Sequence, residues 1–137
     1  MTLVVDSSLV FAGLAERGTL GSWAGGVLAS DDLAAPHIMP VETAHVLRRA
    51  VLTSRLAGDA ASTAHRDLLD LDVALVAYAT IAHRVWELRS NVTAYDACYV
   101  ALAEMLGAPL ATLDRRLARA SGTLCEFLTP PAALQPD

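Results

Sequence analysis

Lysine is absent from this chain of 137 residues, and all ten of its basic side chains are arginines. The absence excludes mechanisms that need an amine, namely the lysine of P-loop nucleotide-binding proteins, the lysine of haloacid-dehalogenase-like phosphatases and receiver domains, and Schiff-base chemistry. Several common α/β families with aspartate-rich sites are therefore excluded as the family of this chain. Arginine still provides planar, bidentate contacts with phosphate groups.

Cysteine is scarce, and a long apolar segment is lacking. Cys98 and Cys125 do not have the spacing of metal ligands, so we expect each to be a small buried apolar side chain rather than a ligand or a disulfide partner. The longest nearly apolar run, residues 73–82, is about ten residues, whereas roughly 18 to 20 are needed to cross a bilayer. The first residues lack a basic segment followed by an apolar one. We therefore expect no membrane contact and a cytoplasmic location.

Aromatic residues make up only 5% of the chain, although hydrophobic residues reach 54%, above the roughly 45–50% of soluble domains. Alanine, leucine and valine therefore supply most of the apolar content, and the surplus suggests a partner that covers apolar surface. An excess of basic residues is lacking too. The net charge of −5 argues at first against a nucleic-acid partner, because phosphate contacts usually need positive charge.

Short apolar segments alternate with helical ones along the chain. Pro40 fits the first turn of a long helix, and Thr93 and Gly107 fit the N-cap and C-cap of another. The alternation predicts one α/β domain over residues 1–137, with a mostly parallel central sheet of four to five strands and helices on both faces. We expect strands at residues 3–5, 33–35, 73–79, 109–112 and 124–128, helices at 9–16, 22–30, 41–55, 58–71, 81–88, 94–106 and 114–120, and an irregular tail at 129–137.

Four acidic residues follow predicted strands or open predicted helices. Asp6 ends the first strand, Glu42 and Asp96 lie in the first turns of two helices, and Asp114 follows the fourth strand. Acids in such positions often only cap helices, because carboxylates are favoured near the free N–H groups and the positive end of a helix. However, a parallel sheet brings these four positions to one edge, where ligands usually bind.

Four carboxylates at one edge would repel one another, and a divalent cation is the usual solution. Oxygen ligands without an accompanying histidine or cysteine favour Mg²⁺, which Mn²⁺ can replace, over zinc. We therefore predict that Asp6, Glu42, Asp96 and Asp114 are the metal ligands. The hydroxyls of Ser7, Ser8 and Thr112 could hold a ligand water or the substrate.

Four stretches around these acids resemble the PIN domain, and specifically a VapC-type toxin ribonuclease. Each motif is short, but all four occur in the right order and spacing, and the resemblance covers nearly the whole chain. The stretches are VVDSS at 4–8, PVETAHVLRR at 40–49, TAYDACYVALAE at 93–104 and LATLDRRL at 110–117. The resemblance places the acidic quartet of the family on Asp6, Glu42, Asp96 and Asp114, and so implies that these metal ligands are also the catalytic residues.

The resemblance implies a three-layer fold and a metal-dependent endoribonuclease that cleaves tRNA, ribosomal RNA or mRNA and leaves a 5′-phosphate and a 3′-hydroxyl. It also implies inhibition by a cognate VapB antitoxin, a homodimer, and a larger toxin–antitoxin complex. Some members carry a fifth acid shortly after the last one. Here residues 115–117 are Arg, Arg and Leu, so this chain lacks the fifth acid that could bind a second metal ion.

The acidic net charge can be reconciled with an RNA substrate. If a metal ion neutralised the quartet, the charge would rise from −5 to about −1, and arginines could dominate locally. Arg115 and Arg116 follow Asp114 directly and are our candidates for phosphate contacts, with Ser7 and Thr112 as further substrate-binding residues. The cluster of Arg48, Arg49 and Arg55 is a second candidate, although both clusters could also be solvated helix faces.

Several side chains allow two interpretations. His45 could face the site but is expected to be an exposed or orienting histidine rather than a ligand. Tyr95 and Tyr99 are expected in the core or a dimer contact rather than as stacking platforms for bases. Trp23, Val27 and Leu28 could line a groove for an antitoxin segment or simply pack in the core.

Two other functions remain open from the residues alone. One is a different carboxylate and Mg²⁺ phosphohydrolase, such as a phosphatase or a flap-type nuclease. The other is a non-catalytic module whose acids only cap helices and whose apolar faces bind protein. The response to Mg²⁺ and the nature of the cleaved substrate would separate them.

Overall fold

The protein has five strands and seven α-helices in the part of the chain that the structure, a computed structural model, describes, residues 1–30 and 32–135. None of the helices in these ranges is long and apolar enough to span a bilayer. The strands are β1 (Thr2–Val5), β2 (Asp32–Pro36), β3 (Val73–Val76), β4 (Leu110–Ala111) and β5 (Phe127–Leu128). The helices are α1 (Ser7–Ala15), α2 (Gly18–Ser30), α3 (Met39–Leu52), α4 (Gly58–Asp70), α5 (Tyr78–Glu87), α6 (Ala94–Leu106), α7 (Arg115–Ala118) and the 3₁₀ helix η1 (Ala132–Leu134).

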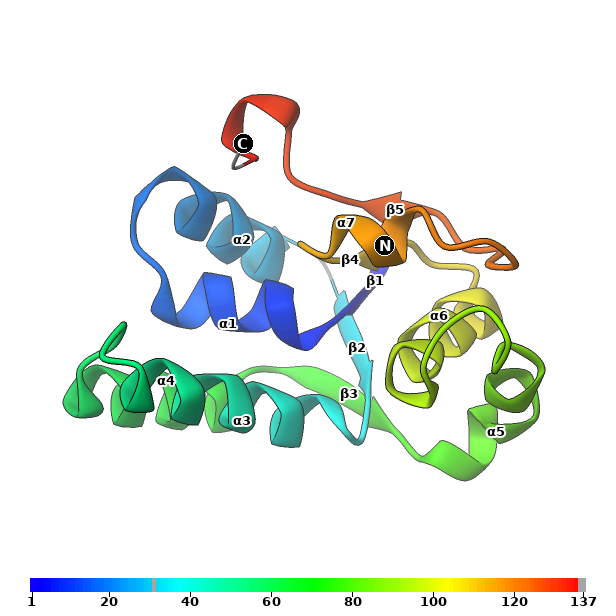
Figure 1. The fold of residues 1–137 in the computed structure, drawn as a ribbon, viewed down its shortest axis with the longest axis horizontal. Helices are drawn as coiled ribbons and strands as arrows, with labels where there is room; N and C mark the ends of the chain where they lie inside the picture. The colour runs from blue at the N-terminus through cyan, green and yellow to red at the C-terminus, as the bar shows by residue number, and fades with distance from the viewer. Residues whose placement is uncertain (31, 136–137) are drawn as a thin grey trace.

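The strands form one sheet in the order β3-β2-β1-β4-β5, and every neighbouring pair is parallel. Helices α1 to α4 lie on one side of the sheet, and α5 and α6 lie on the other (Figure 1). The predicted parallel sheet with helices on both faces is therefore confirmed. From β1 the chain continues to β2 on one side and later returns to β4 on the other. The order thus reverses between β1 and β4, where open α/β sheets bind their ligands.

The core is built from aliphatic side chains on both faces of the central strands. Leu3, Val4 and Val5 of β1 are buried, as a strand covered on both faces requires. Helix α6 is buried over Ala97–Ala103 and packs on β1, β2 and β4. Val27 is buried, and Trp23 and Leu28 pack partly buried against the same core, which favours core packing for these three residues.

Cys98 is buried, as predicted, whereas Cys125 is only half-buried, and both are free thiols.

Several element boundaries differ from the predicted ones because neighbouring elements fix them. Helix α1 begins at Ser7, two residues before the predicted Leu9, because the Asp6 side chain caps the helix by accepting a hydrogen bond from the Leu9 N–H. Strand β3 ends at Val76 rather than Ala79, because its neighbour in the described sheet, β2, ends at the paired Pro36. Strand β5 is shorter than predicted because it pairs with only two residues of β4.

The other helix boundaries shift by a few residues. Helix α2 begins at Gly18 rather than Ser22, and α5 begins at Tyr78 rather than Ile81. Helix α3 covers Met39–Leu52 rather than residues 41–55. Helix α7 covers only Arg115–Ala118, because Asp114 is its cap. Helix α6 has the predicted bounds, with Thr93 and the left-handed Gly107 as its caps. The tail contains one 3₁₀ turn, and its last two residues lie outside the described ranges.

The packing of α2 against the end of α1 depends on two helical glycines in different ways. A Cβ atom added at Gly21 would lie 2.2 Å from the Glu16 carbonyl oxygen, whereas one added at Gly26 would meet nothing within 4 Å. We expect Gly21→Ala to lower the free energy of unfolding by about 1–3 kcal/mol, because backbone has to move. Gly26→Ala should raise it by about 0.5–1 kcal/mol, because alanine loses less conformational entropy in a helix. Urea unfolding of both variants tests this pair, and equal effects would contradict it.

Candidate functional site

Four acidic side chains meet at the carboxyl edge of the sheet, and four different elements carry them. Asp6 follows β1, and Asp114 lies three residues beyond the end of β4, which pairs with β1 through Val5 and Ala111. Glu42 lies in the first turn of α3, and Asp96 lies in the first turn of α6. The reversal point of the sheet therefore lies between two of the predicted site residues.

Asp6 is the most deeply buried of the four, with only 6% of its surface exposed. Its Oδ1 accepts hydrogen bonds from Ser8 Oγ at 2.7 Å and from the Leu9 N–H at 3.0 Å, and its Oδ2 accepts one from Thr112 Oγ1. Burial raises the pKa of Asp6 to about 6; these hydrogen bonds oppose the shift, and the charge of Asp114 adds to it. Ionised Asp6 is thus costly in the metal-free protein.

Ser8 and Thr112 join the ends of β1 and β4 around Asp6. Thr112 is fully buried, and its Oγ1 accepts a hydrogen bond from the Asp114 N–H at 2.9 Å. The Ser8 hydroxyl accepts one from the Leu113 N–H at 3.0 Å. Ser7 is half-buried at the start of α1, where its hydroxyl interacts with Tyr99. Ser8 and Thr112 therefore position Asp6 and the loop that carries Asp114.

Glu42 has a partner that the sequence analysis assigned to the core or a dimer contact. Tyr99, only 2% exposed, donates a hydrogen bond from its hydroxyl to Glu42 Oε1 at 2.5 Å. Burial raises the pKa of Glu42, the bond from Tyr99 opposes this, and the charge of Asp96 adds to it. Burial and the same hydrogen bond also raise the pKa of Tyr99, which stays protonated. The sequence carried one signal for a place of Tyr99 in the site: Tyr99 follows Asp96 by three residues, so the two side chains lie on the same face of one helix.

The other two acids flank the N-termini of two helices. Thr93 caps α6 by accepting a hydrogen bond from the Asp96 N–H at 3.1 Å, so Asp96 itself is not the cap. Asp114 caps α7 by accepting hydrogen bonds from the N–H groups of Arg116 and Leu117 at 2.9 and 3.2 Å. Burial raises the pKa of Asp96, the charge of Asp114 adds to this, and the Thr93 bond and the charge of Arg116 oppose it.

Helix capping therefore accounts for only part of the acidic set. Asp6 and Asp114 do cap helices, as the alternative interpretation required. Glu42 and Asp96 do not, because α3 has no side-chain cap and Thr93 caps α6. The burial of Glu42 and Asp96 beside other negative charges raises their pKa values and needs a different explanation.

The donor chemistry of the four side chains fits a hard divalent cation. Each acid lies within electrostatic reach of the next, in the order Asp6, Asp114, Asp96 and Glu42, and all their donor atoms are carboxylate oxygens. Within residues 1–30 and 32–135, however, no three His, Cys, Asp or Glu side chains are drawn together closely enough to form a preassembled metal site. The carboxylates thus line an open site.

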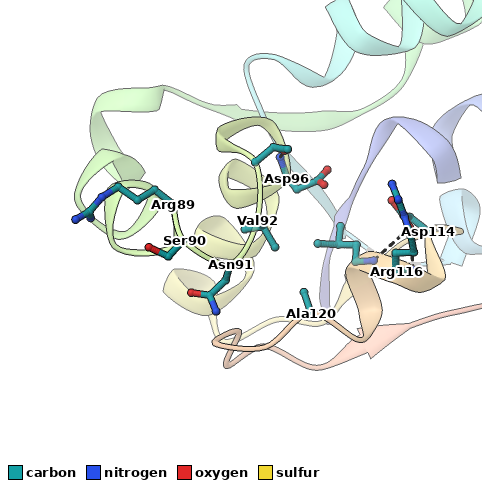
Figure 2. A pocket seen from close by; sticks show the side chains of 10 residues that line it. Arg89, Ser90, Asn91, Val92, Asp96, Asp114, Arg116 and Ala120 are labelled. Atoms are coloured by element: carbon teal, nitrogen blue, oxygen red, sulfur yellow. Dashed lines mark hydrogen bonds between the residues drawn. The ribbon is translucent and has the colours of Figure 1, made fainter.

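A hollow of about 510 Å³ opens beside two of the acids. The Asp96 carboxylate points across it toward Asp114 and Arg116, and the connection between α5 and α6 forms the opposite wall (Figure 2). Its lining residues are Arg89, Ser90, Asn91, Val92, Thr93, Asp96, Asp114, Arg116, Leu117 and Ala120. Residues 90–92 were predicted only as a loop and Thr93 only as a helix cap, so this wall of the hollow was not predicted from the sequence.

The two predicted phosphate-binding arginines of α7 have different surroundings. Arg116 lines the hollow, and its charge influences Asp96. Arg115 does not line it, and its Nη1 donates a hydrogen bond to Gln135 Oε1 at 3.2 Å. The exposed side chains of Arg48, Arg49, Arg55 and His45 are also outside the lining of the hollow. Tyr95 is 60% exposed, so it is not in the core, and its place in a dimer contact stays a prediction.

Comparisons with known proteins agree with this geometry. The family model of the PIN domain matches residues 3–122. Ribonuclease VapC1 of Mycobacterium tuberculosis is 41% identical over 125 residues, which cover 90% of this chain and 94% of the relative. VapC ribonuclease Mb0985 of Mycobacterium bovis is 35% identical over 129 residues, which cover 94% and 98%.

Two solved structures share the fold. The crystal structure of Mycobacterium tuberculosis VapC20, described as a sarcin-ricin loop cleaving toxin, has a TM-score of 0.69 at 20% identity and covers 93% of this chain and 99% of its own. VapBC2 from Rickettsia felis, bound to a DNA fragment from its promoter, has a TM-score of 0.63 at 12% identity and covers 93% and 98%. Together with the sequence matches, these findings show that the chain belongs to the PIN-domain family and, within it, to the VapC ribonucleases.

Proposed function

We propose that this protein is the toxin of a type II toxin–antitoxin system and acts as a metal-dependent endoribonuclease. The single observation that carries the proposal is the set of Asp6, Glu42, Asp96 and Asp114, held beside one another at the reversal point of the sheet in a chain related to VapC ribonucleases. An RNA substrate in turn implies that the protein acts in the cytoplasm, where tRNA, ribosomal RNA and mRNA are found.

We propose that the four carboxylates hold Mg²⁺, with Mn²⁺ as a possible substitute. When bound, such an ion activates water for attack on a phosphodiester and offsets the negative charge of the departing oxygen. Asp6 is the most deeply buried of the four acids and is fixed by Ser8 and Thr112. Asp96 points into the hollow (Figure 2), and we assign to it the role of accepting the proton that the attacking water would lose.

Arg116 is our candidate for the phosphate contact. It lines the hollow within electrostatic reach of Asp96, so its guanidinium can hold the phosphodiester beside the carboxylates. Ser7 and Thr112 stay proposed as substrate-binding residues, although Thr112 is fully buried and its hydroxyl is bonded to Asp6. Arg115 also stays proposed, but it would have to leave Gln135 to reach the hollow.

A VapB-type antitoxin and a homodimer are the partners that we propose. The relatives carry the name VapC, and one structural neighbour is a VapBC complex. Large apolar side chains are exposed in the first turns of three helices, namely Val41 in α3, Tyr78 in α5 and Tyr95 in α6. Such side chains suit a surface that another chain covers, which agrees with the apolar surplus in the composition.

The nuclease activity is tested by incubating antitoxin-free protein with total RNA and Mg²⁺ and by mapping the cleavage ends. We expect discrete cuts with 5′-phosphates that disappear in EDTA, and a decrease of about 100-fold or more in Asp96→Asn, because a ligand is lost. Asp59→Asn is the matched control, since Asp59 also lies in the first turn of a helix but is exposed on α4. Cleavage that survives EDTA and Asp96→Asn would overturn the proposal.

The metal site also predicts that the free energy of unfolding depends on pH differently with and without Mg²⁺. The pKa of Asp6 is about 6 in the folded protein and 3.8 when unperturbed, so the unfolded chain loses its proton first as the pH rises. In EDTA, Asp6 should therefore lower the free energy of unfolding by about 2 kcal/mol between pH 4 and pH 6.5, with little further loss above it. Saturating Mg²⁺ favours the ionised carboxylates and should reduce or reverse this loss.

Urea unfolding at four pH values checks this prediction, with Asp6→Asn as the reference. The difference in the free energy of unfolding between wild type and variant isolates Asp6 from other titrating groups. In EDTA the variant should gain on the wild type as the pH rises, and it should gain little from Mg²⁺. A difference that does not vary with pH would show that Asp6 titrates normally.

The hydrogen bond from Tyr99 to Glu42 gives a further test. We expect Tyr99→Phe to weaken Mg²⁺ binding, measured by calorimetry, about 10-fold, because Glu42 loses the donor that orients it. Tyr95→Phe is the control on the same helix, since Tyr95 is exposed and makes no side-chain hydrogen bond to a described residue. Equal Mg²⁺ affinity in both variants would mean that Tyr99 acts only in packing.

A further inference from the structure

The hollow beside Asp96 and Asp114 extends well beyond the acids. Its volume of about 510 Å³ lies within the roughly 300–1,000 Å³ of small-molecule sites, larger than a metal ion and its waters require. We propose that it binds one unpaired nucleotide next to the cleaved bond, and that the connection between α5 and α6 selects its base. This inference rests on the proposed ribonuclease function and names the substrate group that enters the hollow.

Ser90 and Asn91 provide the groups that can recognise a base edge. The Ser90 hydroxyl is exposed and makes no hydrogen bond to a residue in the described ranges. Asn91 donates from Nδ2 to Ser121 Oγ at 3.1 Å, so its Oδ1 and its second amide hydrogen are left for a ligand. A hydroxyl and an amide are side-chain types that hydrogen-bond the edges of unpaired bases.

The apolar part of the lining suits the flat faces of a base. Val92, Leu117 and Ala120 also line the hollow. Leu117 is buried, and the other two are half-buried, so they form a firm surface rather than mobile side chains. A site with an apolar floor and a few polar groups at one side is typical of small-ligand recognition.

The recognising wall is held rigidly. Asn91 packs against Gly122, where an added Cβ atom would lie 3.0 Å from the Asn91 side chain. Arg84 donates from Nη2 to the Gly122 carbonyl at 2.9 Å and from Nε to Glu104 at 2.7 Å, and Glu104 accepts from the Leu124 N–H at 2.8 Å. These bonds join α5, α6 and residues 121–124. Because the wall is already ordered, it loses little conformational entropy when a nucleotide binds.

Arginines lie at two sides of the hollow, where the phosphates of a bound nucleotide would leave it. Arg116 lies beside the acids (Figure 2). The Arg89 guanidinium points away from them, 4.6 Å from the centre of the Trp86 ring, and donates to the Trp86 carbonyl at 2.8 Å. One cation at the cleaved bond and one at the outer rim match a nucleotide with a phosphate on each side.

The inference is tested with RNA substrates that vary one nucleotide at a time around the cleaved bond. We compare kcat/KM for all four bases at each position in wild type, Ser90→Ala and Asn91→Ala. Each variant should reduce the preference between bases at one flanking position by about 3- to 10-fold, with the other positions unchanged, because one hydrogen bond is lost. Stabilisation by Mg²⁺ should stay as in wild type.

Ser121→Ala is the matched control. Like Asn91→Ala, it removes the hydrogen bond between Asn91 and Ser121, but Ser121 does not line the hollow, so Asn91 can still contact a bound base. A change seen only in Asn91→Ala therefore reports a lost contact with the base, and a change seen in both variants reports a loosened loop. An unchanged base preference in Ser90→Ala and Asn91→Ala, or an equal change in Ser121→Ala, would overturn the inference. If wild type did not cleave RNA at all, the proposed function would fail first.

Discussion

The cost of placing negative charge at the carboxyl edge of the sheet determines how this site is built. Asp6 is buried, and its carboxylate is tolerated only because Ser8, Thr112 and the Leu9 N–H donate to it. These donors come from both sides of the reversal point, so the same bonds that stabilise the charge also join β1 to β4. The remaining cost appears as a raised pKa, which a bound cation would remove.

The same constraint explains why several residues serve two purposes. Asp6 and Asp114 cap α1 and α7, so the helix N-termini lower the cost of charges that the site requires. Glu42 and Asp96 lie in the first turns of α3 and α6 but do not cap them, and a buried tyrosine and the nearby Arg116 lower the cost of their charges instead. Capping and the proposed metal binding are therefore compatible, because a carboxylate has about four lone-pair sites and the capping bonds of Asp114 use only its Oδ1.

The distribution of basic residues is consistent with an acidic protein that acts on RNA. The chain has a net charge of −5, and arginine alone supplies its positive charge. Two of the arginines line the hollow beside the acids, so the local field there differs from the average over the surface. A guanidinium suits this position because it keeps its charge beside carboxylates and binds phosphate in a planar geometry.

The sequence by itself determined the parallel α/β class, the bounds of α6 with both caps, and the four acids, because each depends on local signals such as apolar runs, cap residues and an acid at the end of a strand. It did not determine where β3 ends, since that depends on the length of its neighbour β2.

Tertiary structure alone brought Tyr99 to Glu42, separated Arg115 from Arg116, and closed residues 89–93 against residues 117–122 to form the hollow. These features join residues far apart in the chain, whose contacts follow from how helices pack on the sheet. Local patterns of charge and hydrophobicity do not encode such packing, so only the folded chain decides it.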